Sequence, residues 1–257
     1  MAVKRAEGRK RLRLLLVLLG LTLGLIAAWG ATRSVILDVD HFEVNGLSSH
    51  SETDVIAAAD VLRGTPLLDV DLGLVDSRVR GLAWAKEAKA ARQWPGTIRI
   101  DVVERVPMAL IPSSEGVYAV IDESAVVTAE VTLASAPDLP VIDVPLDTKL
   151  GEIESSAIPG LAVIAAMPPD LFAWVQLVLV DVETGRVGLD LVGSARVDLG
   201  DEFLLADKLE SVRSVLAGAD LTCVALIDAS VADLPTIERD AQCDGSSDPD
   251  ANTAGGE

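Results

Sequence analysis

Residues 92–107 contain a turn followed by an alternating strand, and they read Arg92-Gln93-Trp94-Pro95-Gly96-Thr97-Ile98-Arg99-Ile100-Asp101-Val102-Val103-Glu104-Arg105-Val106-Pro107. The segment Trp94-Pro95-Gly96-Thr97 is typical of a turn, because proline presets φ and glycine accepts a positive φ. Ile98, Ile100 and Val102 then alternate with polar side chains, which predicts a half-buried strand. A short mixed strand is expected before the turn, over residues 86–92.

Upstream of these strands, the pattern predicts a first strand and a helix. Val39, Phe42 and Val44 precede Asn45-Gly46, as in a strand that ends in a turn. Ser51 precedes an acidic first turn, which is close to a capping box. Apolar residues at helical spacing follow as far as Gly64, where a helix would stop: Val55, Ile56, Ala59 and Leu62.

A second helix is expected between Gly64 and the mixed strand. Either Asp69 or Asp71 can cap it, and its apolar positions are Leu72, Val75, Val79 and Leu82. The element order is therefore strand-helix-helix-strand-strand within about 70 residues. This order predicts a small α+β module in which two helices cover one face of three strands.

The N-terminal region predicts a membrane anchor. Residues 14–32 contain no charged side chain, and as a helix they would be about 28 Å long, close to the hydrocarbon thickness of a bilayer. Six basic residues precede them against one acid, Glu7, which predicts a cytoplasmic N-terminus and an extracytoplasmic remainder. The alternative is a cleaved signal peptide, whose apolar core is normally about 7–15 residues. Because this run is longer and its small-x-small sites are poor, we predict an uncleaved, single-pass helix.

The charge balance excludes one class of partner. The chain carries 21 Lys and Arg and 40 Asp and Glu, whereas residues 34–257 alone carry 14 and 39, a net charge of −25. Nucleic-acid binding is not expected, because the cations that neutralise phosphates are missing. The simplest interpretation is an acidic, solvated surface that keeps the exported part soluble.

A strand-rich second region follows Pro107. Hairpins are predicted around Asp122-Glu123-Ser124-Ala125 and Glu183-Thr184-Gly185, and helices around residues 161–167 and 205–216. A late strand is expected over residues 221–228. From Cys243 onward the chain contains almost no apolar side chain, which predicts a disordered acidic tail.

These features together resemble the FtsQ/DivIB family of bacterial cell-division proteins. The Arg92–Thr97 segment and Glu104-Arg105-Val106-Pro107, behind a basic tail and one membrane helix, are similar to the POTRA module of that family. Val197-Asp198-Leu199-Gly200 followed by Lys208 resembles its second domain, although Ala125 stands where the family usually has glycine. The resemblance extends over residues 1–239. The domain limits that we predict are 1–13 (cytoplasmic tail), 14–32 (transmembrane helix), 34–105 (POTRA), 106–239 (FtsQ-type β domain) and 240–257 (tail).

The resemblance implies a non-catalytic scaffold at the division septum, which assembles and regulates septal wall synthesis by binding other division proteins. The implied partners are membrane proteins of the FtsB/DivIC and FtsL type, and the implied mode is strand addition within about residues 222–238. Candidate contact residues are Val224, Leu226, Ile227, Val231, Leu234 and Ile237, with Asp228 as a turn or polar anchor. Each apolar one could equally fill the core of the sheet. The family's recruitment role maps onto strand 86–92 and the turn after it, where Trp94 is expected to pack.

No catalytic chemistry is expected. His41 and His50 do not belong to a cluster with metal-ligand spacing, and no nucleophile-elbow or His-Glu-x-x-His sequence occurs. We therefore expect no metal, no cofactor and no small-molecule substrate. The alternatives are a POTRA module in protein secretion, which the low aromatic content disfavours, and a membrane-anchored wall hydrolase with an acidic pair. Cys223 and Cys243 form either a disulfide, which persists outside the cytoplasm, or two free thiols.

Overall fold

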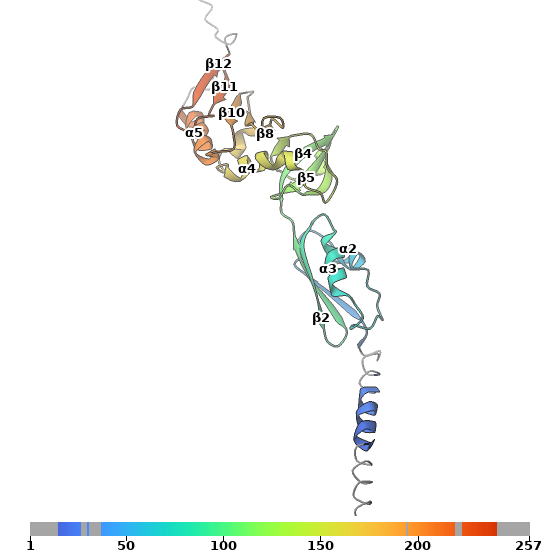
Figure 1. Ribbon diagram of the computed structural model, residues 1–257. Helices are drawn as coiled ribbons and strands as arrows, with labels where there is room; N and C mark the ends of the chain where they lie inside the picture. The colour runs from blue at the N-terminus through green and yellow to red at the C-terminus, as the bar shows by residue number, and fades with distance from the viewer. Residues whose placement is uncertain (1–14, 27–29, 31–36, 194, 219–222, 241–257) are drawn as a thin grey trace, which may run out of the picture. The chain divides into compact units, whose positions relative to one another are not determined.

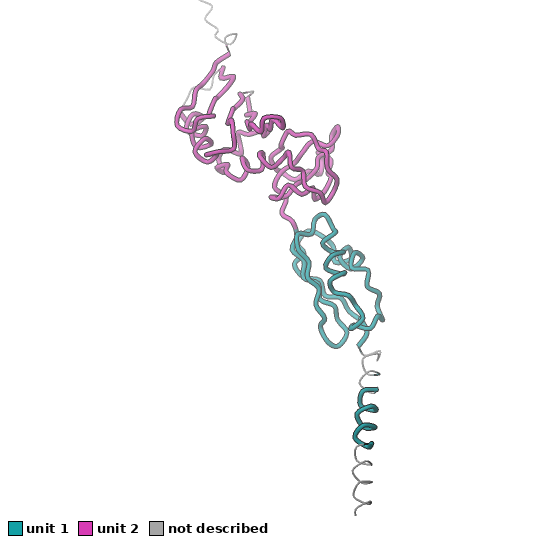
Figure 2. Tube along the Cα trace, viewed as in Figure 1, with its two compact units in different colours: residues 1–104 teal, residues 105–257 magenta. Residues whose placement is uncertain are grey.

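The structure is a computed structural model that describes residues 15–26, 30, 37–193, 195–218 and 223–240 (Figure 1). The chain divides into two compact units, residues 1–104 and 105–257 (Figure 2). Residues 15–26 are helical. Among the described residues, no helix has both the length and the apolar character needed to cross a membrane. The segment predicted to do so, 14–32, falls partly outside the described residues. The predicted tail 1–13 lies wholly outside them, and of the predicted tail 240–257 only Asp240 is described.

The first unit has the predicted order of elements. They are β1 (His41–Asn45), α2 (Glu52–Ala59), α3 (Leu72–Arg80), β2 (Ala85–Gln93) and β3 (Thr97–Glu104). The sheet order is β1-β3-β2, with β1 parallel and β2 antiparallel to the central β3. The α+β prediction for this module is confirmed.

Alternation along β3 builds the core of this unit. Ile98, Ile100 and Val102 are buried and pack with Val55 and Ala59 of α2 and with Val75 and Val79 of α3. Each helix begins at a side-chain cap. The Ser51 hydroxyl accepts a hydrogen bond from the Thr53 N–H, and Asp71 Oδ1 accepts one from the Leu74 N–H at 3.1 Å. Asp71, and not Asp69, is therefore the cap of α3.

The turn between β2 and β3 depends on close packing at Gly96. Its carbonyl accepts hydrogen bonds from the N–H groups of Asp40 and His41, at 2.8 and 3.2 Å. A Cβ atom at Gly96 would lie 2.5 Å from the Asp38 carbonyl oxygen. The prediction of a positive φ at Gly96 is wrong, since the glycine is required for this close approach instead. The expectation that Trp94 packs is also wrong, because its side chain is 55% exposed.

Arg92 holds β2 against the segment between the two helices. Its Nε donates a hydrogen bond to the Leu67 carbonyl oxygen at 2.7 Å. On the same strand, the Ala90 N–H donates to Asp76 Oδ1 of α3 at 2.6 Å. Because Ala90 also pairs with Ile100 of β3, α3 covers part of the outer edge of β2.

The first unit ends at Glu104, whose carboxylate closes the loop before α2. It accepts hydrogen bonds from the Ser48 hydroxyl at 2.5 Å, from the Ser49 and His50 N–H groups, and contacts His50 Nδ1 at 3.1 Å. The His50 ring stacks on Trp84, with 4.0 Å between ring centroids. Burial raises the pKa of Glu104, but these hydrogen bonds outweigh it and lower the pKa to about 2.

The second unit begins with Arg105, which forms a buried ion pair. Its Nη1 lies 2.7 Å from Asp122 Oδ2, and the two side chains are 19% and 2% exposed. Asp122 Oδ1 also accepts hydrogen bonds from the N–H groups of Ser124 and Val126. Ala125 closes this turn by donating to the Asp122 carbonyl, and it takes φ 60°, the left-handed conformation that usually favours glycine.

One nine-stranded sheet organises the second unit, which confirms the strand-rich prediction. Its order is β12-β11-β10-β9-β8-β7-β4-β5-β6. The strands are β4 (Pro107–Ser114), β5 (Val117–Asp122), β6 (Val127–Thr132), β7 (Val141–Asp143), β8 (Val175–Val180), β9 (Val187–Leu191), β10 (Arg196–Gly200), β11 (Val224–Asp228) and β12 (Thr236–Arg239). Helix α4 (Ile158–Ala166) packs on β8 and β9, and α5 (Leu205–Gly218) packs on β10.

Replacing Gly96 by alanine is expected to destabilise the first unit by about 1–3 kcal/mol, because the new methyl group must displace backbone. The matched control is Gly73→Ala in α3. The nearest atom to its added Cβ is an Asp71 carboxylate oxygen at 3.4 Å, so this change should stabilise the helix by about 0.5–1 kcal/mol. Amide hydrogen exchange of β3 in the full chain measures both effects. Equal protection of β3 in the two variants would contradict the steric explanation.

Glu104→Gln should lower the unfolding free energy of the first unit at pH 7 by about 1–3 kcal/mol, because the donors lose a charged acceptor. The folded-state pKa lies below the ordinary value, so this stabilisation is complete above about pH 4.5 and is lost as the pH falls toward 2. The difference between wild type and variant should therefore shrink over that range, as measured by hydrogen exchange or urea unfolding. Glu87→Gln, on the exposed part of β2, serves as the control, and a pH-independent difference would refute the assignment.

Candidate partner-binding site

Strand β12 forms one edge of the nine-stranded sheet. Within the described part of the chain it pairs only with β11, antiparallel, from Thr236 opposite Asp228 to Arg239 opposite Val224. No described strand therefore pairs with the outer side of β12. Such an edge is suited to the addition of a strand from another chain.

The loop between β11 and β12 exposes two large apolar side chains. Val231 is 58% exposed and Leu234 is 72% exposed. The loop is nevertheless held in place, because the Leu234 N–H donates to the Val231 carbonyl and the Ser211 hydroxyl of α5 donates to the Ala232 carbonyl. Both candidate contact residues are thus displayed from a fixed loop that leads directly into β12.

The other apolar candidates lie deeper. Ile227 is fully buried, Val224 is nearly so, and Ile237 packs against the same core. Leu226 is half-buried on the opposite face, where it pairs with Arg196 of β10 and Glu238 of β12. Val231 and Leu234 are therefore the most exposed of the apolar candidates, Leu226 is partly accessible, and Val224 and Ile227 belong to the core.

Asp228 ends β11 and turns the chain into the exposed loop. Its Oδ1 accepts a hydrogen bond from the Ser230 N–H at 2.9 Å. Hydrogen bonds from the Ser230 hydroxyl and N–H lower the pKa of Asp228, and the nearby positive charge of Arg186 lowers it further. Arg186 itself pairs with Asp198 of β10 at 2.6 Å. Asp228 thus orders the turn as a charged group.

Cys223 lies immediately before β11 and has φ 60°. Cys243, its predicted disulfide partner, lies outside the described residues. The pairing of Cys223 with Cys243 stays a prediction. On the described side, the Asp240 N–H donates to the Cys223 carbonyl at 2.8 Å, which ties the end of β12 to the start of β11.

The segment before α5 contains a feature that the sequence pattern does not reveal. Lys208 is buried, and its Nζ donates to the Asp201 carbonyl and to Asp201 Oδ1, at 3.0 and 2.6 Å. This hydrogen bond lowers the pKa of the Asp201 carboxyl. The loop of residues 201–204, which these hydrogen bonds hold to α5, exposes Phe203 and Leu204. The backbone of Leu204 has φ 55°. No local residue preference predicts a left-handed leucine, so only the tertiary contacts identify this loop.

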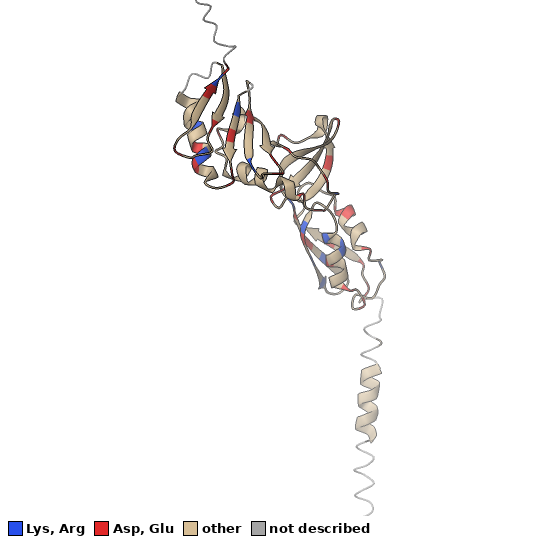
Figure 3. Ribbon diagram, turned by 45° about the horizontal axis from the view of Figure 1, so that its top comes forward, with Lys and Arg blue, Asp and Glu red and all other residues tan. Residues whose placement is uncertain are grey.

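Acidic residues dominate the second unit (Figure 3). Residues 105–257 contain 27 Asp and Glu and seven Lys and Arg, a net charge of −20. Among the described residues, no group of three or more His, Cys, Asp or Glu side chains is arranged to hold a metal ion. The second unit is therefore strongly acidic, and β12 and β6 are the two edge strands of its sheet.

The sequence of this chain is similar to one family model and to several known bacterial proteins. The family model of the POTRA domain, FtsQ-type, matches residues 37–105. The "Cell division protein FtsQ" of Mycobacterium bovis is 30% identical over 224 residues, which cover 86% of this chain and 64% of that protein. The protein of the same name from Mycolicibacterium smegmatis is 29% identical over 205 residues, 79% of this chain and 58% of that protein.

A third relative is similar to a comparable degree. The "Cell division protein FtsQ" of Caulobacter vibrioides is 30% identical over 190 residues, which cover 63% of this chain and 61% of that protein. The chain thus spans about three-fifths of the length of the curated relatives it matches.

Proposed function

Because the chain belongs to the FtsQ family of cell-division proteins, we propose that it is a non-catalytic scaffold of the division machinery. It binds other division proteins through its two extracytoplasmic domains, which we limit to residues 34–105 and 106–239. Through them it assembles and regulates septal wall synthesis. Its partners are membrane proteins of the FtsB/DivIC and FtsL type.

The observation that carries this proposal is the open edge of β12 beside an exposed apolar loop. A partner strand that pairs with β12 gains backbone hydrogen bonds, and Val231 and Leu234 supply side-chain contacts next to it. Pro235 precedes β12 and has no N–H to donate, so the added ladder begins after it. A disulfide between Cys223 and Cys243 would join the residue before β11 to the segment after β12 and so restrict the movement of β12.

The scaffold is held at the septal membrane by one helix, residues 14–32, with its N-terminus in the cytoplasm. The charge-free run and the basic residues before it support this topology. The first domain contributes to recruitment through β2 and the turn that contains Trp94, whose exposed ring is available for contact.

An uncleaved anchor predicts that the mature protein keeps residues 14–32. Peptide mapping by mass spectrometry of the protein extracted from membranes should therefore recover this segment joined to the residues that follow it. Removal of a signal peptide would instead shorten the protein by roughly 30 residues. That result would contradict the anchor and leave the extracytoplasmic location intact.

Leu234→Asp should weaken capture of partner ectodomains of the FtsB/DivIC and FtsL type by at least about tenfold, because a charge replaces an apolar contact at the edge of the interface. The control is Leu133→Asp, since Leu133 is exposed to a similar degree, 68% against 72% for Leu234. Leu133 follows β6, the opposite edge of the sheet. Both variants should keep the wild-type melting temperature. If Leu234→Asp captures partners as well as Leu133→Asp does, the interface does not lie at this loop.

A further inference from the structure

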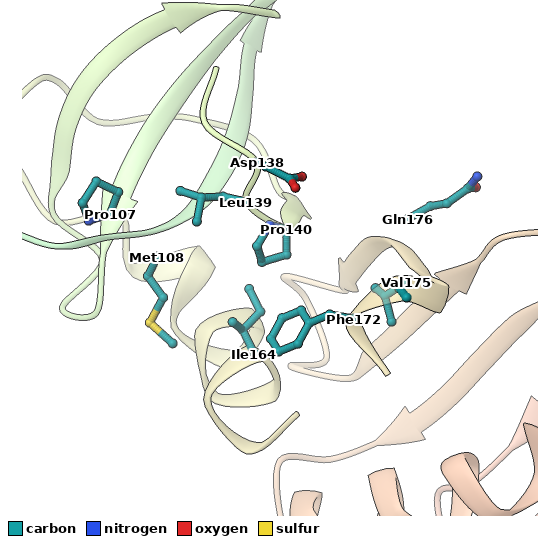
Figure 4. A pocket seen from close by; sticks show the side chains of 10 residues that line it. Pro107, Met108, Asp138, Leu139, Pro140, Ile164, Phe172, Val175 and Gln176 are labelled. Carbon is teal, nitrogen blue, oxygen red and sulfur yellow. The ribbon is translucent and has the colours of Figure 1, made fainter. Parts of the chain in front are cut away.

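A second binding feature lies in the middle of the nine-stranded sheet, away from β12. It is a pocket of about 750 Å³ near the first residues of β4 and β8 (Figure 4). Strand β7 pairs with β4 only through Val141 and Leu110. Before Val141 the chain runs as Asp138-Leu139-Pro140 outside any strand. The pocket forms between this segment, the starts of β4 and β8, α4 and the short helix η4 (Phe172–Trp174).

Apolar side chains from four elements converge in the pocket. Met108, Pro140, Ile164 and Phe172 all line it, and Figure 4 shows Pro140, Ile164 and Phe172 close together with Met108 to one side. Ile164 is only 6% exposed and forms buried lining, whereas Phe172 is 37% exposed. A concave site of this size and lining suits a large apolar group.

The margin of the pocket carries one charge. Asp138 is the only charged residue that lines it, and Gln176 is the only other polar one. Within the described chain, the Asp138 carboxylate has no hydrogen-bond or ion-pair partner. An apolar pocket beside a free carboxylate is complementary to an apolar side chain with a neighbouring cation.

The second unit cannot supply that cation itself. Five of its seven basic side chains are engaged in ion pairs with its own acids: Arg105, Arg186, Arg196, Lys208 and Arg213. None of the seven lines the pocket. The tail 241–257 does not fit either, because it contains four acids, no base and no large apolar side chain. Neither the second unit nor the tail therefore supplies a suitable occupant.

We propose that this pocket is a second docking site of the scaffold, for an extended segment of a partner protein that bears a large aliphatic or aromatic side chain next to a lysine or arginine. The proposal rests on the proposed function as a binding scaffold, but it uses a surface separate from the β12 edge. Strands β9, β10 and β11 lie between β8 and β12 in the sheet. Two partner segments can therefore occupy the unit at the same time.

Fluorescence polarisation of labelled hexapeptides with the full chain in detergent micelles tests the chemistry. The probes are Gly-Ser-Leu-Lys-Ser-Gly, its Leu-Glu counterpart and its Ala-Lys counterpart. The Leu-Lys peptide should bind at least tenfold more tightly than either of the others. Equal binding of the Leu-Lys and Leu-Glu peptides would overturn the role of Asp138, and equal binding of Leu-Lys and Ala-Lys would overturn the role of the pocket.

Variants then locate the site. Asp138→Lys should reverse the preference, so that the Leu-Glu peptide binds more tightly than the Leu-Lys peptide; a misfolded protein cannot produce this reversal. Glu115→Lys, an exposed acid outside the pocket, is the matched control and should keep the wild-type preference. Ala173→Trp should fill the pocket and abolish binding of both peptides without changing the melting temperature. Unchanged preference in Asp138→Lys, or unchanged binding in Ala173→Trp, would refute the proposal.

Two further outcomes separate this proposal from others. Leu234→Asp should leave peptide binding intact, so that failure of the β12 interface and failure of the pocket give different results.

Leu62 is exposed and is followed by Arg63 in this same chain. If the full chain self-associates in sedimentation and both Leu62→Ala and Ala173→Trp abolish the association, the occupant is a second copy and the proposal of a partner is wrong.

Discussion

Two adjacent residues, Glu104 and Arg105, fix the ends of the two folded units. The Glu104 carboxylate holds the loop of residues 48–50 to the end of β3, and Arg105 pairs with Asp122 at the first hairpin of the second unit. Each contact is made within one unit, so each unit is closed locally and the chain crosses between them at one peptide bond. A buried ion pair contributes less to net stability than its Coulomb energy suggests, but loss of one partner leaves an uncompensated charge. Removal of either partner alone is therefore expected to destabilise the unit, although the intact pair adds little net stability.

The periodicity of apolar residues predicts the positions of helices and strands in this chain. It does not predict the surroundings of individual turn residues. The alternation of Ile98, Ile100 and Val102 places β3, and the caps Ser51 and Asp71 place the two helices, because these signals depend on neighbouring residues only. Gly96 and Trp94 show what neighbouring residues cannot predict. The steric demand at Gly96 comes from Asp38, which lies 58 positions away in sequence. Whether Trp94 is buried depends on what covers the turn, and local sequence carries no information about this. Ala125 adopts the left-handed turn conformation without glycine because its N–H and the Asp122 carboxylate stabilise that turn.

The candidate interface was located by resemblance, whereas the roles of its residues required the sheet order. Val224, Ile227, Val231 and Leu234 are all apolar, and nothing in their spacing separates buried from exposed. Their places in the fold do so, because Val224 and Ile227 face the core from β11, whereas Val231 and Leu234 lie in the loop before β12. Ile227 therefore belongs to the core and Leu234 to the surface. The pocket beside Asp138 could not be found from sequence, since its lining comes from β4, the segment before β7, α4 and η4, which meet only in the folded sheet.

The charge of the second unit gives these surfaces their selectivity. Its basic side chains are mostly paired with nearby acids, as in Arg186–Asp198 and Arg196–Asp190, so they neutralise single carboxylates without reducing the long-range negative potential of the rest. Such a potential accelerates the approach of cationic partners and repels acidic ones, while exposed pairs add little binding energy. At the proposed interfaces, affinity is then expected to come from desolvated contacts: the backbone of β12, Leu234 and the pocket around Phe172. The long-range potential acts on the rate of association, whereas the desolvated contacts act on the rate of dissociation. Added salt screens the potential, so it should slow association more than it speeds dissociation.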